Sequence, residues 1–221
     1  MNAGFNRFSP VSKVLLNPDT PPVNPHPWDD EFDVDGVLDG KWTAVNYNGA
    51  STIETIVNSR YYLTDVARNT RLMGIEQAIG SPGSFRVRLK WEMEAGIANY
   101  NGCGIGFKNS GNGRYVWLGV LFNSGSGYCS PYCIRCSNAT TYVSEVYIAS
   151  WTLASHGYME VEYNGTSLLL KTSISGLNFP TVLTEAIATY LAAAPTHLGP
   201  MSHHYGIAIA HSYDWFRKVQ L

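Results

Sequence analysis

Three cysteines within eight residues form the densest group of reactive side chains in this sequence. Cys129, Cys133 and Cys136 follow the spacing C-x3-C-x2-C, and Cys103 is the fourth cysteine of the chain. Thiolates at such spacings can bind an iron–sulfur cluster, or zinc with Cys103 as the fourth ligand. The alternative is a set of reduced thiols in and beside a strand, because free cysteine is commonly buried like a small apolar residue. We expect the second arrangement, and therefore no metal and no cofactor.

Six carboxylates lie close together early in the chain, and their density invites comparison with calcium sites. They are Asp29, Asp30, Glu31, Asp33, Asp35 and Asp39. The run from Glu31 to Gly36 matches the start of an EF-hand loop, but its twelfth position is Trp42, where that loop needs a bidentate glutamate. An EF-hand is thus excluded. A calcium site at a sheet edge remains one interpretation, and a solvated loop with acidic caps is the one we favour.

Two pairs of glutamates have the spacing that could place two carboxyl groups beside a glycosidic bond. Glu92 and Glu94 share one strand face, and so do Glu160 and Glu162. Such pairs on strands are more often the solvated side of a sheet. The sequence also has no serine-hydrolase, zinc-protease, P-loop or dinucleotide-binding motif. We therefore predict a protein without enzymatic activity.

Aromatic side chains near two central strands form a candidate glycan-binding surface. Exposed rings stack on the apolar faces of sugars, while amide and guanidinium groups bind the hydroxyls. The candidate residues are Tyr100, Asn101, Arg114, Tyr115, Trp117 and Tyr128. The alternative is core packing, because Tyr115 and Trp117 share one strand face, which can be the interior one.

Alternation of apolar and polar residues predicts that strands carry these side chains. Every second residue of Ser84–Glu94 is apolar, which is typical of a strand with one buried and one solvated face. Arg114–Asn123 is apolar on both faces, so we expect it at the centre of a sheet. Residues 180–194 are compatible with a short helix or a strand, and we favour a strand. The other early and middle strands are predicted at Lys41–Asn46, Ser51–Asn58, Arg60–Val66, Arg71–Ala78, Gly102–Lys108, Tyr132–Cys136 and Tyr142–Ala149.

The end of the chain carries the strongest topological signal. Asn164, followed by glycine, separates the runs Tyr158–Tyr163 and Ser167–Ile174, which predicts a hairpin whose two turn residues have positive φ. The last stretches, Gly206–Ala210 and Tyr213–Val219, are apolar and aromatic. We expect the final strand to insert into a sheet that is already built.

Composition limits the partners of the chain. Only 14% of its 221 residues are charged, whereas it has 21 glycines, 14 tyrosines and 6 tryptophans, which suits many strands joined by tight turns. The formal net charge of −2 gives no electrostatic basis for binding nucleic acid or an anionic membrane. No apolar stretch approaches the ~18 residues of a membrane span. The run Val14 to Leu16 is too short for a secretory signal, so we expect synthesis in a cytosol.

Residues 1–27 differ in composition from the rest. They contain six of the eleven prolines, and prolines at this density favour an extended chain that cannot join a central strand. The segment is either a disordered leader or an arm that docks on a partner. We favour the arm, because a solvated linker would rarely carry so many apolar side chains. The anchoring residues would be Phe5, Phe8, Val14, Leu15 and Leu16.

Several short motifs resemble those of a known superfamily. The opening Trp28-Asp-Asp-Glu-Phe32 and Leu38-Asp-Gly-Lys-Trp42 is similar to that of concanavalin A-like lectin/glucanase (laminin G-like) sandwiches. Further matching segments are Tyr158–Gly165, Ser173–Phe179, His197–Gly199 and Asp214–Arg217. The resemblance covers about residues 28–221 and implies two packed, curved antiparallel sheets, with the later segments as late strands and the closing strand. The E-x-D-x-x-E motif of the glucanase members is absent.

Two further resemblances bear on function. Domains with this opening behind a proline-rich leader resemble those of tailed-phage virion proteins. The spacing C-x3-C-x2-C resembles that of radical-SAM enzymes, but that family places it after the first strand of an α/β barrel, and this chain lacks the alternation of strands and helices.

We therefore predict an all-β fold: a two-sheet antiparallel jelly-roll sandwich over residues 28–221, behind an extended arm over residues 1–27. Trp42 and Trp215 are expected to be buried where the first and last strands meet. The predicted function is that of a non-enzymatic virion surface protein, such as a capsid decoration, head-fibre or tail-associated component, present as an oligomer or in many copies. The arm would bind other virion proteins, and the sandwich would bind host-surface glycans. The alternatives are a free carbohydrate-binding lectin and a glycan hydrolase.

Overall fold

The computed structural model describes residues 17–22, 24–46, 52–65, 72–80, 82–95, 100–123, 128–148, 155–206 and 208–219. This part of the chain forms fourteen strands and one short 3-10 turn, Ile187–Thr189. The strands are β1 (Thr43–Val45), β2 (Thr52–Ile56), β3 (Tyr61–Asp65), β4 (Leu72–Ala78), β5 (Phe85–Ala95), β6 (Gly102–Asn109), β7 (Arg114–Asn123), β8 (Tyr128–Asn138), β9 (Thr141–Tyr147), β10 (His156–Tyr163), β11 (Ser167–Ser173), β12 (Thr181–Ala186), β13 (His197–His203) and β14 (Ile209–Val219). In the part of the chain that the structure describes, no helix is long and apolar enough to cross a membrane.

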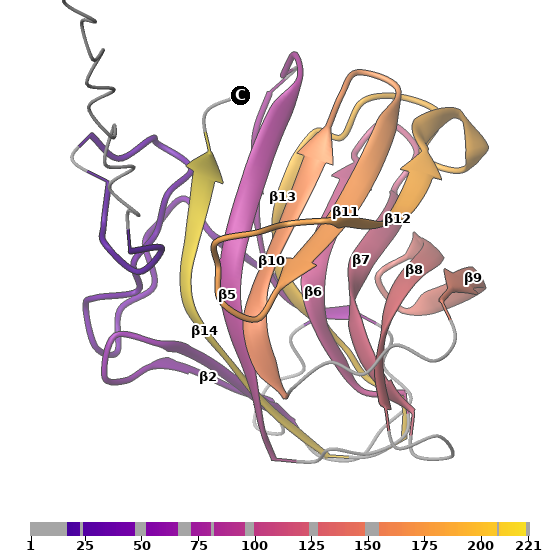
Figure 1. Cartoon of the computed structure of the whole chain (residues 1–221). Helices are drawn as coiled ribbons and strands as arrows, with labels where there is room; N and C mark the ends of the chain where they lie inside the picture. Colours follow the sequence, from indigo (N-terminus) through magenta and orange to yellow (C-terminus); the bar gives the residue numbers. More distant parts are fainter. Residues whose placement is uncertain are drawn as a thin grey trace, which may run out of the picture.

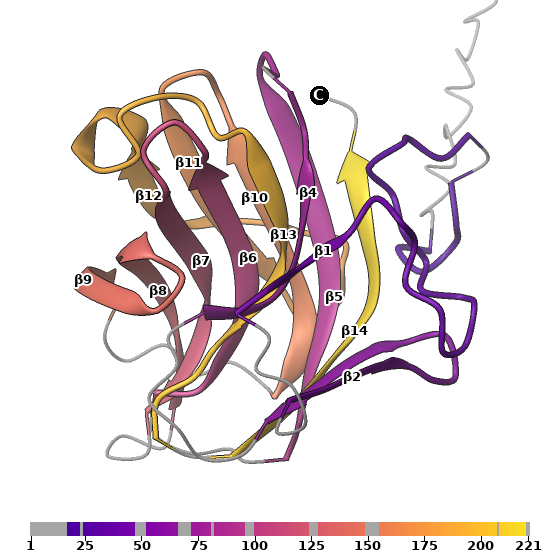
Figure 2. The same cartoon turned by 180° about the vertical axis from the view of Figure 1, so that it is seen from behind.

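The strands form two seven-stranded sheets packed face to face (Figures 1 and 2). Sheet A has the order β12-β11-β10-β5-β14-β3-β2, and sheet B has the order β1-β4-β13-β6-β7-β8-β9. All pairings within both sheets are antiparallel. The predicted all-β antiparallel sandwich is confirmed, and β7 lies inside sheet B as its apolar sequence predicts.

Strand alternation fills the space between the sheets. The apolar positions of β5 are Phe85, Val87, Leu89, Trp91 and Met93, each at most 3% exposed, and they pack against inward residues of sheet B. Burying a large apolar side chain contributes roughly 1.5–3 kcal/mol, so this one strand supplies a substantial part of the core. The residues between them face outward from sheet A, where they form ion pairs.

The closing strand β14 lies in the middle of sheet A, between β5 and β3, which confirms the predicted insertion. It is one strand, whereas the sequence predicts a pair. Its register shifts between Tyr213 and Trp215, so Asp214 is an extra residue and the strand bulges. Phe216 returns to the core, where it contacts the ring of Trp42 edge-on at 5.7 Å. Trp42 thus joins the first and last parts of the sandwich as expected.

Strand β13 lies between β4 and β6. Its residue pattern predicted no strand, and only the resemblance placed His197–Gly199 in a late strand. Its centre is Gly199-Pro200, and proline is normally confined to edge strands because it has no N–H to donate. In the pairing of β13 with β4, neither of these two residues has a partner. The absence of an N–H on Pro200 therefore costs no hydrogen bond between these two strands. A Cβ at Gly199 would lie 2.1 Å from the carbonyl oxygen of Ile75, so only glycine fits this close approach.

The hairpin between β10 and β11 forms where the sequence predicts it, but its turn differs. Only Gly165 has a positive φ, of 97°. Asn164 instead accepts hydrogen bonds through Oδ1 from the backbone N–H groups of Thr166 and Ser167, at 3.0 and 2.9 Å. The register pairs Tyr163 with Leu168, so residues 164–167 form the turn, and the asparagine side chain stabilises it in place of a second residue with positive φ. The ambiguous stretch after Pro180 is a strand, β12, followed by the 3-10 turn.

Candidate functional site

Of the six predicted glycan-binding residues, the five whose side chains the structure describes do not meet on an exposed surface. Asn101 and Trp117 are fully buried, and Tyr115 is 5% exposed. Tyr100 lies beside Phe122 near the end of β7, whereas Arg114 begins that strand, so the two lie at opposite ends of sheet B. Tyr128 begins β8, and its side chain lies outside the described part of the structure.

Trp117 lies flat on the outer face of sheet B, the face turned away from sheet A. A Cβ at Gly104 or Gly119 would lie 2.4 or 2.5 Å from its ring, so these glycines make the space that the indole fills. Its Nε1–H donates to the carbonyl of Met201 at 2.9 Å. The turn between β8 and β9 reaches the far side of this face, where Ala139 accepts a hydrogen bond from the N–H of Leu72 at 2.9 Å. Trp117 is fully buried, so its ring has no exposed face on which a sugar could stack.

Tyr115 is also engaged by the protein. Its hydroxyl donates to Glu76 at 2.8 Å, and Lys108 donates to the other oxygen of the same carboxylate at 2.6 Å. Burial, together with the negative charge of Glu76, raises the pKa of Tyr115 well above its usual value. Glu76 is only 5% exposed. Tyr115, Glu76 and Lys108 thus satisfy one another's hydrogen bonds, beside the apolar cluster on the outer face of sheet B.

The cysteines fall on two sides of sheet B. Cys103, Cys129 and Cys133 belong to the core between the sheets, whereas Cys136 lies in the cluster on the outer face. Cys129 and Cys133 are four residues apart on β8, whereas Cys133 and Cys136 are three apart, so strand alternation points the third thiol to the opposite face. Burial raises the pKa of Cys129 to about 11. In the described part of the chain no three histidine, cysteine or acidic side chains are grouped so as to hold a metal ion.

The early acidic residues serve as caps and ion-pair partners. Asp29 accepts the backbone N–H groups of His26 and Lys218, at 2.7 and 2.6 Å. Asp30 accepts the indole N–H of Trp42 at 2.6 Å. Glu31 binds the guanidinium of Arg217 through both oxygens, at 2.7 and 2.6 Å. These partners favour the interpretation as a capped loop.

The two glutamate pairs lie on the outer face of sheet A within a ladder of opposite charges. Glu160, 2% exposed, binds Arg88 at 2.7 Å and Lys171 at 3.2 Å. Glu92 and Glu94 both face Arg60, at 2.9 and 3.4 Å. Such cross-strand pairs each contribute ~0.2–1 kcal/mol. The carboxylates are thus committed to ion pairs rather than presented in pairs to a substrate.

A network of buried polar side chains lies between the two sheets. His211 shares a hydrogen bond of 2.7 Å through Nδ1 with the hydroxyl of Ser202, which in turn lies 2.9 Å from the hydroxyl of Tyr213. His204 lies 3.5 Å from Asp65. Burial, and then the neighbouring His204, lower the pKa of His211 to about 3. All these side chains are inaccessible to a substrate, so their role is structural.

Residues near Asp19 cover outward side chains of the closing strand β14, and Asp30 pairs with Phe216 along the edge of the same strand. Asp19 accepts the indole N–H of Trp215 at 3.3 Å and lies 3.3 Å from Lys90. The guanidinium of Arg217 donates to the carbonyls of Pro18, Thr20 and Asp19, at 2.7, 3.1 and 3.2 Å. Residues 17–27, assigned to the arm by the sequence analysis, are therefore packed on the sandwich. The predicted anchors Phe5, Phe8, Val14, Leu15 and Leu16 lie outside the described residues.

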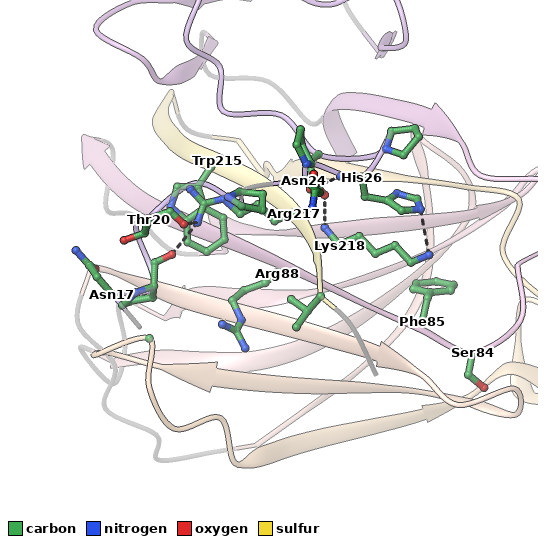
Figure 3. A pocket seen from close by; sticks show the side chains of 17 residues that line it. Asn17, Thr20, Asn24, His26, Ser84, Phe85, Arg88, Trp215, Arg217 and Lys218 are labelled. Atoms are coloured by element: carbon green, nitrogen blue, oxygen red, sulfur yellow. Dashed lines mark hydrogen bonds between the residues drawn. The ribbon is translucent and has the colours of Figure 1, made fainter. Parts of the chain in front are cut away.

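A cavity of about 970 Å³ lies between this segment and the strands β5 and β14 (Figure 3). The wall formed by the segment is made of proline rings and the polar side chains of Asn17, Thr20 and Asn24. The opposite wall includes Ser84 from the start of β5, together with side chains of that strand and of β14. Its charged residues are Arg88, Arg217 and Lys218 against the single carboxylate of Asp29. The cavity is therefore lined mainly by polar groups with some apolar patches, and more cations than carboxylates line it.

The residues of this cavity come from the two ends of the sequence, and the sequence analysis did not connect them. Trp215 and Arg217 alternate with core residues on the closing strand, which indicates that they face outward. Nothing in the sequence indicates that the proline-rich stretch covers this particular strand.

The architecture is that of a concanavalin A-like sandwich, as the sequence resemblance implies. Among solved structures, the CBM2 module of an evolved Dit from Lactobacillus casei BL23 phage J-1 is 10% identical, with a TM-score of 0.58 over 88% of this chain and 96% of that one. The catalytic domain of a Thermotoga petrophila endo-1,3-beta-glucanase (laminarinase) is 8% identical, with a TM-score of 0.56 over 87% and 96%. The exoplasmic/lumenal domain of VIP36, in a Ca²⁺/Man3GlcNAc-bound form, is 11% identical, with a TM-score of 0.50 over 82% and 85%.

No family model matches the sequence, and no curated protein matches it. The likeness therefore defines the fold and leaves the function to be argued from the site.

Proposed function

We propose that this protein is a non-enzymatic carbohydrate-binding module and that the cavity beneath residues 17–29 is its binding site. The cavity itself carries the proposal. Its volume of about 970 Å³ lies in the range of small-ligand sites. Proline rings offer apolar faces, and the exposed side chains of Asn17, Asn24 and Ser84 offer groups for sugar hydroxyls. Glycan-related proteins of the same fold, the laminarinase and the VIP36 domain, support this class of ligand.

Binding to a panel of neutral and acidic glycans tests the proposal. The full chain should bind at least one glycan, and Ser84→Trp, which places an indole at the wall of the cavity, should abolish that binding. Thr181→Trp, at an exposed position of the edge strand β12, is the matched control and should bind like the parent. Equal binding by Ser84→Trp would move the site away from the cavity, and no binding across the panel would refute the function.

The second part of the test concerns catalysis. A module without enzymatic activity should release no reducing ends from any polysaccharide it binds. The ion pairs of Glu92, Glu94 and Glu160 support this expectation. Release of reducing ends would establish the glycan hydrolase instead.

We further propose that the module is displayed on a virus particle, in several copies, and is attached to other virion proteins by residues before Asn17. The support is the likeness to a phage Dit module of nearly the same extent, together with the apolar residues between Phe5 and Leu16. A chain beginning at Asn17 should bind glycans like the full chain but fail to join particles. Equal incorporation of the shortened chain would place the attachment in the sandwich, and absence from purified particles would favour a free lectin.

A further inference from the structure

The cavity contains a cation without an acidic partner. The ammonium of Lys218 lies 3.2 Å from Nε2 of His26 (Figure 3). It also lies 4.6 Å from the centre of the Trp28 ring. Asp29 is the nearby carboxylate, but its two oxygens accept backbone N–H groups, from Lys218 at 2.6 Å and from His26 at 2.7 Å. Among the described residues, no carboxylate oxygen lies within ion-pair distance of the Lys218 ammonium.

The hydrogen bonds of His26 show the same shortage of acceptors. Its Nδ1 lies 3.2 Å from the backbone N–H of Trp28, and its Nε2 faces the Lys218 ammonium. Both neighbours are donors, whereas a neutral imidazole has only one nitrogen that accepts. In either tautomer, one ring N–H therefore points at another donor. Burial and then the positive charge of Lys218 lower the pKa of His26, whereas the charge of Asp29 acts in the opposite direction.

The other cations of the cavity are already neutralised. Arg217 is bound by Glu31 through both oxygens, and Arg88 is bound by Glu160 and lies 4.0 Å over the ring of Phe179. The excess of donors is thus local to the corner formed by His26 and Lys218. An anionic group placed there would supply the acceptor that both side chains lack, and such charge-assisted bonds are among the strong ones in proteins.

We propose that this corner binds the carboxylate of an acidic sugar unit, so that the module recognises a uronic-acid-containing glycan. The inference rests on the proposed function and adds the chemical class of the ligand. Lys218 would bind the carboxylate, and the hydroxyls of the same or the next sugar would reach the polar groups of Asn24 and Ser84 on the cavity wall.

A matched pair of probes tests the charge directly. Calorimetric titration of the full chain with trigalacturonate should show binding. The fully methyl-esterified trisaccharide, which has the same stereochemistry without the charge, should bind at least tenfold more weakly. Lys218→Gln should weaken trigalacturonate binding by roughly 10- to 100-fold, as expected for loss of a hydrogen bond to a charged group. It should leave binding of the ester unchanged.

Lys108→Gln makes the same change of charge on the outer face of sheet B and is the control, with thermal melting to confirm that both variants fold. Equal binding of acid and ester by the parent, or an unchanged affinity of Lys218→Gln for the acid, would overturn the inference while the glycan-binding function stands. Failure of trigalacturonate to bind the parent would also overturn it. The neutral members of the glycan panel then decide separately whether the proposed function fails as well.

Discussion

The histidine sealed between the sheets makes a quantitative prediction about acid stability. His211 is fully buried, and its pKa is about 3 in the folded protein, against 6.5 for a solvated histidine. Between these values the unfolded chain binds a proton that the folded chain excludes, so stability is lost as the pH falls below 6.5. The slope is ~1.36 kcal/mol per pH unit for one proton. From pH 7 to pH 5 the loss is therefore ~2 kcal/mol, a large share of a typical stability of ~5–15 kcal/mol.

Urea unfolding at a series of pH values between 7 and 5 measures this loss. His211→Asn keeps a polar group facing the hydroxyl of Ser202 but cannot be protonated in this range. Its stability is expected to be lower at pH 7, because a smaller side chain leaves a cavity, but its decline between pH 7 and 5 should be ~2 kcal/mol smaller than that of the parent. His156→Gln, at an exposed position of β10, should keep the parent's acid response. An unchanged slope in His211→Asn would refute the assignment of this proton to His211.

Three further predictions concern packing and metal content. A chain beginning at Asn17 should melt like the full protein. A chain beginning at Trp28 should lose ~3 kcal/mol or more of unfolding free energy, because the deletion uncovers Trp215 and removes three carbonyl partners of Arg217. Equal melting temperatures for both shortened chains would show that residues 17–27 add nothing to stability. Gly104→Ala places a Cβ 2.4 Å from the Trp117 ring and should cost ~1–3 kcal/mol in urea unfolding, whereas Gly40→Ala, with open space around its Cβ, should be near neutral. Elemental analysis of the purified protein should find no zinc or iron, and about one zinc or several irons per chain would contradict the assignment of reduced, metal-free thiols.

The strands were predictable wherever local sequence decides the structure. Ser84–Glu94 alternates cleanly, and β5 occupies Phe85–Ala95 with its apolar residues in the core. β7 matches its predicted bounds, Arg114–Asn123. The residue pattern did not predict β13, because its Gly199-Pro200 centre is a turn signal when read locally. It is a strand because two neighbouring strands enclose it, and only the resemblance placed His197–Gly199 in a late strand.

The site was less predictable, because it depends on contacts between distant residues. Tyr115 and Trp117 were correctly placed on one strand face, but their exposure depends on glycines in β6 and on the turn between β8 and β9. Whether these side chains are buried therefore depends on how the whole sheet curves, which no single strand sequence shows. The cavity joins residues almost 200 positions apart, as the contact between Trp215 and Asp19 shows, and no local pattern carries that information.

The position of β14 has a consequence for biosynthesis. Because β14 lies between β5 and β3, sheet A remains in two separate parts until residues 209–219 have left the ribosome. The segment from Pro18 to Glu31 has its main partners on β14, at Trp215 and Arg217, so it finds its place only after the strands that follow it have been made. The edges of β5 and β3 therefore lack their native partner until β14 emerges. A truncated chain that ends before residue 209 should be a target for chaperones rather than a folded domain.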